Sequence, residues 1–302
     1  MAGTSVNWLV GCCGKSHGFH KTAAWRSGIT RLPVFEILEV QVSSEETKPA
    51  KKADPLMVQS VAKAFRVLEA FDSRHPQMTL SEIAERTNMD LSGAQRFAHT
   101  LHTLGYLSKD AKTRQFELSV KSLDLAYHFT RTSRLVDRAM PVLQHLSKET
   151  EETINLTVLD GTEIVFISRF LSRHVLHTDV TIGTRRPAYC MAPGRAILSR
   201  LPEDELTDLL AASKISPHTQ NTITDVTELR AIIAEARLKG FATAFEELYH
   251  GDASIAAPVL GAHGRVIGAV SVAASTLRYS RDEIVSSFAP MILAAARSIS
   301  FG

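Results

Sequence analysis

The chain has 302 residues, 44% of them hydrophobic, and carries 34 basic against 32 acidic side chains. This length can bury two hydrophobic cores, so we expect two domains. The balanced charge excludes a uniformly basic surface, and nucleic-acid binding would have to depend on where individual charges lie. Three cysteines give neither a disulfide framework nor a metal-site spacing, and no apolar run has the length of a membrane span. We therefore expect a reduced, cytoplasmic protein without a cofactor, a metal or a membrane partner.

Residues 1–55 differ in composition from the rest of the chain. They hold both tryptophans and two of the three cysteines, and they end in a charged run that contains proline. Short matches to a lipoprotein box, a phosphate loop and a hydrolase elbow lack the flanking sequence that these motifs need. We predict that residues 1–55 form a disordered leader, and Met57 is a candidate translation start.

Residues 58–71 begin the organised part of the chain and predict an amphipathic helix. Its apolar stripe, which is expected to face a core, comprises Val61, Ala64, Phe65, Leu68 and Phe71. A second short helix is predicted over residues 79–87. A tight turn follows at residues 88–90, where Asn88 tolerates a positive φ better than most residues.

Residues 91–104 predict a third helix, and Gly105 is suited to end it. Its apolar stripe comprises Ala94, Phe97, Ala98, Leu101 and Leu104. The polar side chains left on its outward face are Ser92, Gln95, Arg96 and His99. Residues 106–118 then predict a hairpin with a polar turn at 110–113. The hairpin contributes the cations Lys109, Lys112 and Arg114.

A helix with a free polar face beside a cationic hairpin is typical of a winged helix-turn-helix, which we predict for residues 56–118. Arg96 can engage guanine or a phosphate at two points, and Gln95 suits an adenine edge. Ser92, near the start of the helix, suits a phosphate. Lys112 and Arg114 are expected to contact the DNA backbone.

A linker of residues 119–132 is predicted to begin with a helix over 119–130, whose apolar face carries Leu123, Ala126 and Phe129. A long helix over 133–150, broken at Pro141, opens the second domain, residues 133–302. Alternating segments then predict strands at 154–159, 163–168, 176–182, 241–246, 254–260 and 266–274. Helices are predicted at 192–201, 203–212 and 226–239, and a capping box from Ser280 to Glu283 begins the last helix. The pattern indicates an α+β domain with one mainly antiparallel sheet.

Several motifs of the first domain resemble the DNA-binding module of IclR-family transcription regulators. They are Leu80-Ser-Glu-Ile-Ala-Glu-Arg86, Gln95-Arg96-Phe97 and Leu104-Gly-Tyr-Leu107. The family's recognition helix usually begins with a Lys-Ser-Thr-like run, whereas this chain has Leu91-Ser92-Gly93. Ser92 and Arg96 match residues that typically touch DNA in the family, and Leu91 and Gly93 do not. The departure affects the operator sequence rather than DNA binding itself.

Residues 133–300 resemble the GAF-like effector-binding domain of the same family. Pro187-Ala-Tyr-Cys190 followed by Gly194-Arg195 resembles the aromatic-acid branch, which responds to protocatechuate, 4-hydroxybenzoate and related acids of the β-ketoadipate pathway. The effector-binding residues that the resemblance implies are Tyr189, Cys190, Ala192, Pro193, Gly194, Ser254, Ser271 and Ala273. Ala244 or Phe245, and Ala273, stand where some relatives have an aspartate and a second serine. This less polar wall favours a ligand larger or more aromatic than glyoxylate or pyruvate.

These residues also have simpler interpretations. Tyr189, Cys190 and Met191 could serve packing alone, and Cys190 could be a reactive thiol. Two histidine pairs have a spacing of three residues, but no third metal ligand is placed in the sequence, so solvent-facing or hydrogen-bonded histidines are the better interpretation. These pairs are His99 with His102 and His174 with His177.

The leading interpretation is a DNA-binding regulator controlled by a small organic acid, aromatic or a ring-cleavage product. It is expected to act on a double-stranded DNA operator as a homodimer or homotetramer, with RNA polymerase as a further candidate partner. Two alternatives stay open. The first is an enzyme, for which no catalytic motif is recognisable in the second domain. The second is a small-molecule sensor that has lost DNA binding.

Overall fold

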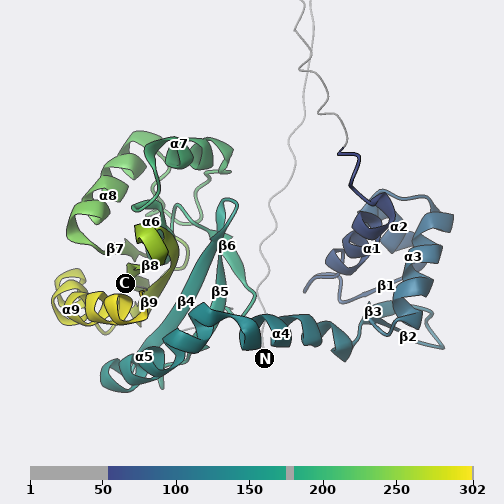
Figure 1. Cartoon of the computed structure of the whole chain (residues 1–302), viewed down its shortest axis with the longest axis horizontal. Coiled ribbons are helices and arrows are strands. Elements are labelled where there is room, and N and C mark those ends of the chain that lie inside the picture. The colour runs from purple at the N-terminus through teal and green to yellow at the C-terminus, as the bar shows by residue number, and fades with distance from the viewer. Residues whose placement is uncertain (1–53, 175–179, 301–302) are drawn as a thin grey trace, which may run out of the picture. The chain divides into compact units, whose positions relative to one another are not determined.

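The structure is a computed structural model that describes residues 54–174 and 180–300. The prediction of a disordered leader falls outside the described residues, apart from residues 54 and 55. A first group of elements extends to the end of β3, and a second, larger group follows the linker helix (Figure 1). None of the helices in the described ranges is long and apolar enough to cross a membrane.

The first group is a winged helix-turn-helix, as predicted. Its helices are α1 (Gln59–Glu69), α2 (Leu80–Thr87) and α3 (Leu91–Thr103). Its strands are β1 (Gln77–Met78), β2 (Leu107–Lys109) and β3 (Phe116–Leu118), and they form an antiparallel sheet in the order β1-β3-β2. Strand β1 was not predicted, because two residues are too short to show an alternating pattern.

Local capping fixes the turn between α2 and α3. Thr79 and Glu82 form a capping box at the start of α2, and Asp90 accepts a hydrogen bond from the Gly93 amide at the start of α3. Asn88 has a φ of 51° and ends α2 in the left-handed region, as expected for this turn. Gly105, with a φ of 85°, follows α3 in the same way. The angle between the two helices is therefore set by local chemistry.

The predicted inward face of α1 is partly wrong. Val61 and Phe65 are 52% and 51% exposed, and the residue of α1 that is fully buried is Val67. Apolar residues cover more than half of the circumference of α1, so periodicity alone did not separate the buried stripe from its apolar neighbours. On α3, Leu104 is 54% exposed because it lies at the end of the helix, beyond the last inward turn.

The linker begins as a short 3-10 helix (Val120–Ser122) and continues as α4 (Leu123–Thr132), which has no buried residue. Helix α5 (Arg134–Thr150) follows, and it runs through Pro141 rather than breaking there. The proline removes one helical hydrogen bond. Leu143 and Leu146, on the far side of Pro141, are buried with Val136 and Ala139 on the near side, and this common core holds the two halves in one helix.

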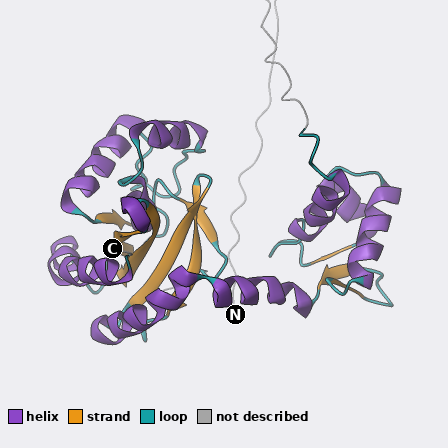
Figure 2. Cartoon of the chain, viewed as in Figure 1, coloured by secondary structure: helices purple, strands orange, loops and turns teal. Residues whose placement is uncertain are grey.

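The second group is built on one antiparallel sheet in the order β6-β5-β4-β9-β8-β7, as the α+β prediction required. Its strands are β4 (Thr153–Asp160), β5 (Glu163–Phe170), β6 (Arg185–Pro187), β7 (Ala242–Phe245), β8 (Asp252–Leu260) and β9 (Val266–Ser275). Its remaining helices are α6 (Ala192–Leu198), α7 (Glu203–Ala212), α8 (Val226–Lys239) and α9 (Arg281–Ile299). Figure 2 shows the strands lying between helices.

The third strand of this sheet is not where we predicted it. Residues 180–182 are not in a strand, residues 175–179 lie outside the described ranges, and β6 begins at Arg185. The Thr184 amide donates to the Thr181 carbonyl, and Gly183 has a φ of 89°, so the chain turns before it joins β5. Helix α6 also ends at Leu198, three residues earlier than expected.

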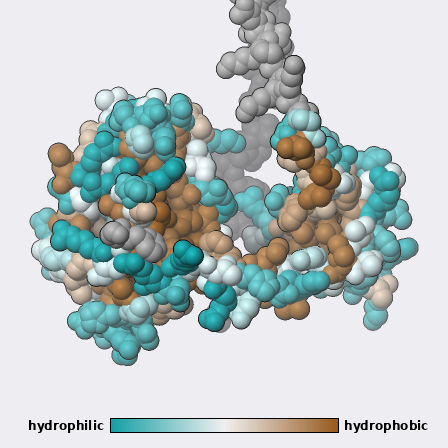
Figure 3. Space-filling view, viewed as in Figure 1, coloured by the Kyte–Doolittle hydropathy of each residue, from teal (hydrophilic) through white to brown (hydrophobic). Residues whose placement is uncertain are grey.

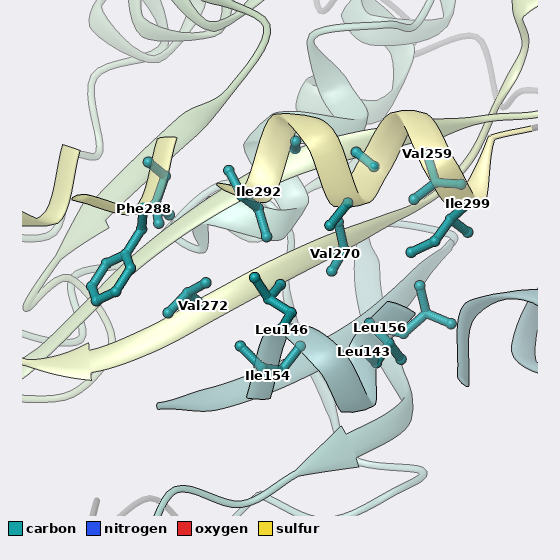
Figure 4. Packing of buried hydrophobic residues seen from close by; sticks show 14 of the residues in the cluster. Leu143, Leu146, Ile154, Leu156, Val259, Val270, Val272, Phe288, Ile292 and Ile299 are labelled. Atoms are coloured by element: carbon teal, nitrogen blue, oxygen red, sulfur yellow. The ribbon is translucent and has the colours of Figure 1, made fainter. Parts of the chain in front are cut away.

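Each face of the sheet carries its own core. On one face, Leu143 and Leu146 of α5 and residues of α9 pack against β4, β8 and β9, where Figure 4 shows Val270 and Val272 on the strand that passes beside α9. The other face is covered by α6 and α8, and its buried cluster includes Tyr189, Ile197 and Ile233. The polar residues described below interrupt this second face.

Candidate functional site

The polar side chains that were predicted to lie on the outward face of α3 are exposed there. Ser92, Gln95, Arg96 and His99 are all exposed, while Ala94 and Ala98 on the opposite face are fully buried. The Ser92 hydroxyl donates to Asp90 at 3.0 Å, and this hydrogen bond is the main cause of the lowered pKa of Asp90. The capping carboxylate therefore stays ionised and holds the first turn of α3 in place.

The wing, which is the hairpin formed by β2 and β3, presents its cations from a fixed turn. Lys109, Lys112 and Arg114 are exposed. The Asp110 carboxylate accepts hydrogen bonds from the amides of Lys112 at 2.8 Å and Thr113 at 2.6 Å, and these bonds lower the pKa of Asp110, with Thr113 the largest cause.

Charge on this surface is available to an anion. Within the described ranges, Arg96, Lys112 and Arg114 form no ion pair. The Lys109 ammonium lies 5.1 Å from the centre of the Phe116 ring. Among the described residues, the surface thus combines a polar helix face with cations that are outside any ion pair, which is the combination that a DNA groove and its phosphates require.

A cavity lies on the α6 side of the sheet in the second domain. Its lining residues are Asn155, Phe166, Arg169, Val180, Met191, Pro193, Tyr249, Asp252, Ser254, Ser271 and Ala273. Of the eight predicted effector-binding residues, Pro193, Ser254, Ser271 and Ala273 line it. The cavity volume is about 20 Å³, which is room for one ordered water molecule.

The other four predicted effector residues do not line this cavity: Tyr189, Cys190, Ala192 and Gly194. All four are buried beside it at the start of α6. The Tyr189 hydroxyl donates to the Ser216 carbonyl at 2.6 Å and accepts from the Ser216 amide at 3.1 Å. A Cβ atom on Gly194 would lie 2.1 Å from the Ala188 carbonyl oxygen.

Cys190 is not a reactive thiol in this setting. Burial raises its pKa to about 12, and the nearby carboxylate of Glu247 adds to the shift. The thiolate, which is the nucleophilic form, is therefore scarce at neutral pH. Together with the contacts of Tyr189 and Gly194, this favours a packing role for the start of α6.

A chain of hydrogen bonds crosses three strands at the cavity wall. Arg169 of β5 donates to the Asn155 side-chain oxygen of β4 at 3.2 Å, and the Asn155 amide donates to the Ser271 hydroxyl of β9 at 3.4 Å. The strand register makes Asn155 the direct neighbour of both Arg169 and Ser271. Ser254 of β8 is also buried, and its hydroxyl finds no hydrogen-bond partner among the described residues.

The cavity also holds an acidic group. Burial raises the pKa of Asp252, at the start of β8, to about 7, and the positive charge of Arg169 partly offsets the rise. Sequence reasoning missed Asn155, Arg169 and Asp252. The available signal was polar residues within otherwise apolar strands, such as Asn155 between Ile154 and Leu156.

A buried ion pair anchors α6 next to the cavity. The Arg195 guanidinium donates to both carboxylate oxygens of Glu247, at 2.5 and 2.6 Å, and to the Tyr189 carbonyl at 2.8 Å. Both charged side chains are buried, and the pair ties α6 to the segment after β7. Sequence reasoning noted Arg195 but assigned it no partner.

The histidine pairs do not form metal sites where they can be described. Among the described residues, no group of three histidine, cysteine or acidic side chains could hold a metal ion. A His102 ring nitrogen is hydrogen-bonded to the Leu107 carbonyl at 2.9 Å, and His177 lies outside the described ranges.

A winged helix-turn-helix followed by a sheet domain with a small polar cavity defines a DNA-binding regulator with a ligand-binding domain. Comparison with known proteins agrees. Residues 60–111 match the IclR helix-turn-helix domain, and residues 128–301 match the domain described as bacterial transcriptional regulator IclR C-terminal. The chain belongs to the IclR family of transcriptional regulators.

The relatives found are named as regulators rather than enzymes. The Pca regulon regulatory protein of Pseudomonas putida is 32% identical over 257 residues, covering 83% of this chain and 88% of the relative. The regulator KdgR of Escherichia coli strain K12 is 32% identical over 246 residues, with coverages of 82% and 93%. The first of these relatives supports the resemblance to the aromatic-acid branch, and the protein is a regulator, not an enzyme.

Solved structures share the fold. A Rhodococcus sp. RHA1 protein described as a transcriptional regulator has a TM-score of 0.71 and 36% identity, and the match covers 80% of this chain and 97% of the other. An IclR homolog from Microbacterium hydrocarbonoxydans, complexed with 4-hydroxybenzoate, has a TM-score of 0.69 and 23% identity, with the same coverages.

Proposed function

We propose that this protein binds a specific double-stranded DNA operator through α3 and the wing, and that a small organic acid in the cavity on the sheet controls that binding. The observation that carries the proposal is the exposed face of α3, whose polar side chains lie beside cations without ion-pair partners in the described ranges. The division into residues 56–118, 119–132 and 133–302 follows from this assignment.

The roles of individual residues on the DNA side follow from their chemistry. Arg96 is the candidate for two-point recognition of guanine or a phosphate, and Gln95 for an adenine edge. Ser92 and His99 flank them on the exposed face of α3. The wing cations Lys109, Lys112 and Arg114 contact the phosphate backbone, which positions the protein without reading sequence.

The proposed effector is an aromatic acid or a ring-cleavage product. The support is the relationship to the Pca regulon regulatory protein and an apolar wall that includes Phe166, Met191 and Ala273. A cavity of about 20 Å³ is far smaller than the roughly 300–1,000 Å³ of typical ligand pockets. Binding therefore requires that the wall side chains move apart, and such a movement could be passed on to the rest of the domain.

We also propose that the protein works as a homodimer or homotetramer. Large apolar side chains are exposed on α1 and along the linker: Val61, Phe65, Val120, Leu123, Leu125, Tyr127 and Phe129. Figure 3 shows hydrophobic side chains gathering over α1. Exposed apolar patches of this kind mark interaction surfaces, and a two-fold pair of recognition helices would match a partly palindromic operator. A contact with RNA polymerase stays a prediction.

A salt-dependent binding titration tests the proposal. The full chain is titrated by fluorescence anisotropy onto the DNA upstream of its own gene and onto shuffled DNA, between 50 and 200 mM salt (about the range in which phosphate contacts dominate). We expect a steep fall of affinity with salt, tighter binding to the upstream DNA, and a change in affinity when 4-hydroxybenzoate or protocatechuate is added. Equal binding to both DNAs would contradict sequence-specific recognition, and a lack of response to every acid tried would contradict the effector class.

A further inference from the structure

Both signs of charge meet in the effector cavity. Arg169 of β5 and Asp252 of β8 line the same cavity, and their charges interact. Two hydroxyl groups, those of Ser254 and Ser271, line it as well and come from neighbouring strands. The cavity is therefore more than an apolar gap, and its hydrogen-bonding groups restrict what can occupy it.

The hydrogen-bond pattern leaves donors without acceptors. Asn155 accepts a hydrogen bond from Arg169 and donates one to Ser271. The Ser271 oxygen is the acceptor in the second bond, so the hydroxyl proton of Ser271 is still available for donation. Within the described residues, no acceptor is found for that proton, and Ser254 has no partner at all. Unmet buried donors are costly, so the missing partner is a group that accepts hydrogen bonds.

A carboxylate is the acceptor that fits these surroundings. It can accept from both hydroxyl groups and pair with the positive charge of Arg169, and hydrogen bonds to an ionised acceptor are the stronger kind. It would also stand close to Asp252. Two carboxylates that share a site do not both stay ionised, because like charges raise the pKa of one of them.

Asp252 is the group that would accept the proton. Burial already raises its pKa to about 7, and the opposing effect of Arg169 weakens once a second anion shares that cation. Among the described residues, the other ionisable groups around it are Tyr249, whose hydroxyl accepts from Arg186 at 2.5 Å, and Glu246, whose carboxylate accepts from the Gly251 amide at 2.8 Å. Both of these groups already have hydrogen-bond partners.

The family resemblance already implies Ser254 and Ser271 as effector-binding residues; with the effector carboxylate at these hydroxyl groups and beside Arg169, we propose that Asp252 takes up one proton from solvent as the effector binds. The proton forms an O–H bond on the Asp252 carboxylate, and no bond of the ligand changes. This inference rests on the proposed function, since it assigns the chemistry of the same cavity. It makes effector affinity depend on pH in a range where the effector itself does not titrate.

Calorimetry on the full chain tests proton uptake directly. Binding of 4-hydroxybenzoate and of benzoate is measured at pH 8 in buffers with different heats of ionisation, and the dependence on buffer gives the number of protons taken up. We expect nearly one proton at pH 8, well under one at pH 6, and an affinity that falls about fivefold between pH 7 and 8 as Asp252 becomes ionised in the free protein. Benzoate has no phenol, so equal uptake with both acids excludes the ligand's own hydroxyl as the source.

Matched variants test whether Asp252 itself takes up the proton, rather than a general change in the charge of the protein causing the pH dependence. Asp252→Asn should abolish proton uptake and make affinity independent of pH between 6 and 8. Asp208→Asn, at an exposed position on α7, should leave both unchanged. Ser254→Ala should lower affinity about tenfold, the loss expected for one hydrogen bond to a charged group, with proton uptake unchanged.

The outcomes distinguish this inference from the proposed function. If a carboxylic acid binds and alters DNA affinity without proton uptake, the inference is wrong and the proposed function stands. The inference is equally wrong if Asp252→Asn weakens binding of 4-hydroxybenzoate but not of benzoate, because Asp252 would then be accepting from the phenol. If no aromatic or ring-cleavage acid binds at all, both are overturned.

Discussion

Breaking the buried Arg195–Glu247 pair should destabilise the second domain strongly. Glu247→Gln preserves the shape of the side chain and removes its charge. The Arg195 guanidinium, which is 1% exposed and donates to both Glu247 oxygens, would then be a buried charge without a counterion. Loss of one partner of such a pair costs about 3–5 kcal/mol. At about 2–4 °C per kcal/mol for a domain of this size, we expect the melting temperature to fall by roughly 6–20 °C.

Differential scanning calorimetry of the full chain measures this loss, and two variants test the explanation. Glu163→Gln removes an acid from the exposed pair with Arg185 and should cost about 1 kcal/mol or less. Replacing both partners, Arg195→Met with Glu247→Leu, leaves no buried charge and should be less harmful than Glu247→Gln alone. A melting temperature for Glu247→Gln within 2 °C of the wild type (about 1 kcal/mol or less) would refute the assignment of the pair as an anchor of α6.

Three further predictions concern the DNA surface and α6. Arg96→Ala should weaken specific operator binding by about 1–3 kcal/mol and relax sequence preference, and unchanged affinity in a gel-shift titration would remove Arg96 from the recognition surface. Lys112→Ala should weaken binding to operator and shuffled DNA about equally and reduce the salt slope by about one, so a sequence-dependent loss would assign Lys112 to base contact instead. Gly194→Ala places a methyl group 2.1 Å from the Ala188 carbonyl oxygen and should lower the melting temperature and effector affinity together; a variant with wild-type values for both would show that α6 can shift freely.

Much of the first domain could be predicted because its signals are local. The capping residues Thr79 and Asp90, the left-handed position of Asn88 and the exposed face around Arg96 all depend on residues within one or two helical turns. Interactions between residues a few positions apart in the sequence can form whatever the tertiary packing is. This explains why the boundaries of α2 and α3 agree with prediction to within one residue.

The cavity on the sheet could be predicted only in part because its residues meet through strand register. Ser254 and Ser271 were identified through a family resemblance, but the link between Asn155 and Arg169 depends on which residues of β4 and β5 stand opposite each other. A one-residue change of register would turn Asn155 to the other face. Sequence patterns show which side chains of a strand alternate between its two faces, but not which residues of the neighbouring strand stand opposite them. A site assembled from several strands therefore cannot be predicted from these patterns.

The wrong assignment on α1 has a different physical origin. Periodicity reports that an apolar side chain is kept from water, but it does not report which molecule covers it. Val61 and Phe65 were assigned to the core of their own domain, yet each is about half exposed. Leu123 and Phe129 of the linker are also exposed. If a second copy of the chain covers them, as we propose, the sequence pattern was correct about burial and incorrect about the partner. Replacing Phe65 with a charged residue, as in Phe65→Glu, should then shift sedimentation toward the monomer and leave the melting temperature of an isolated chain almost unchanged, whereas a dimer that persists in this variant would place the contact elsewhere.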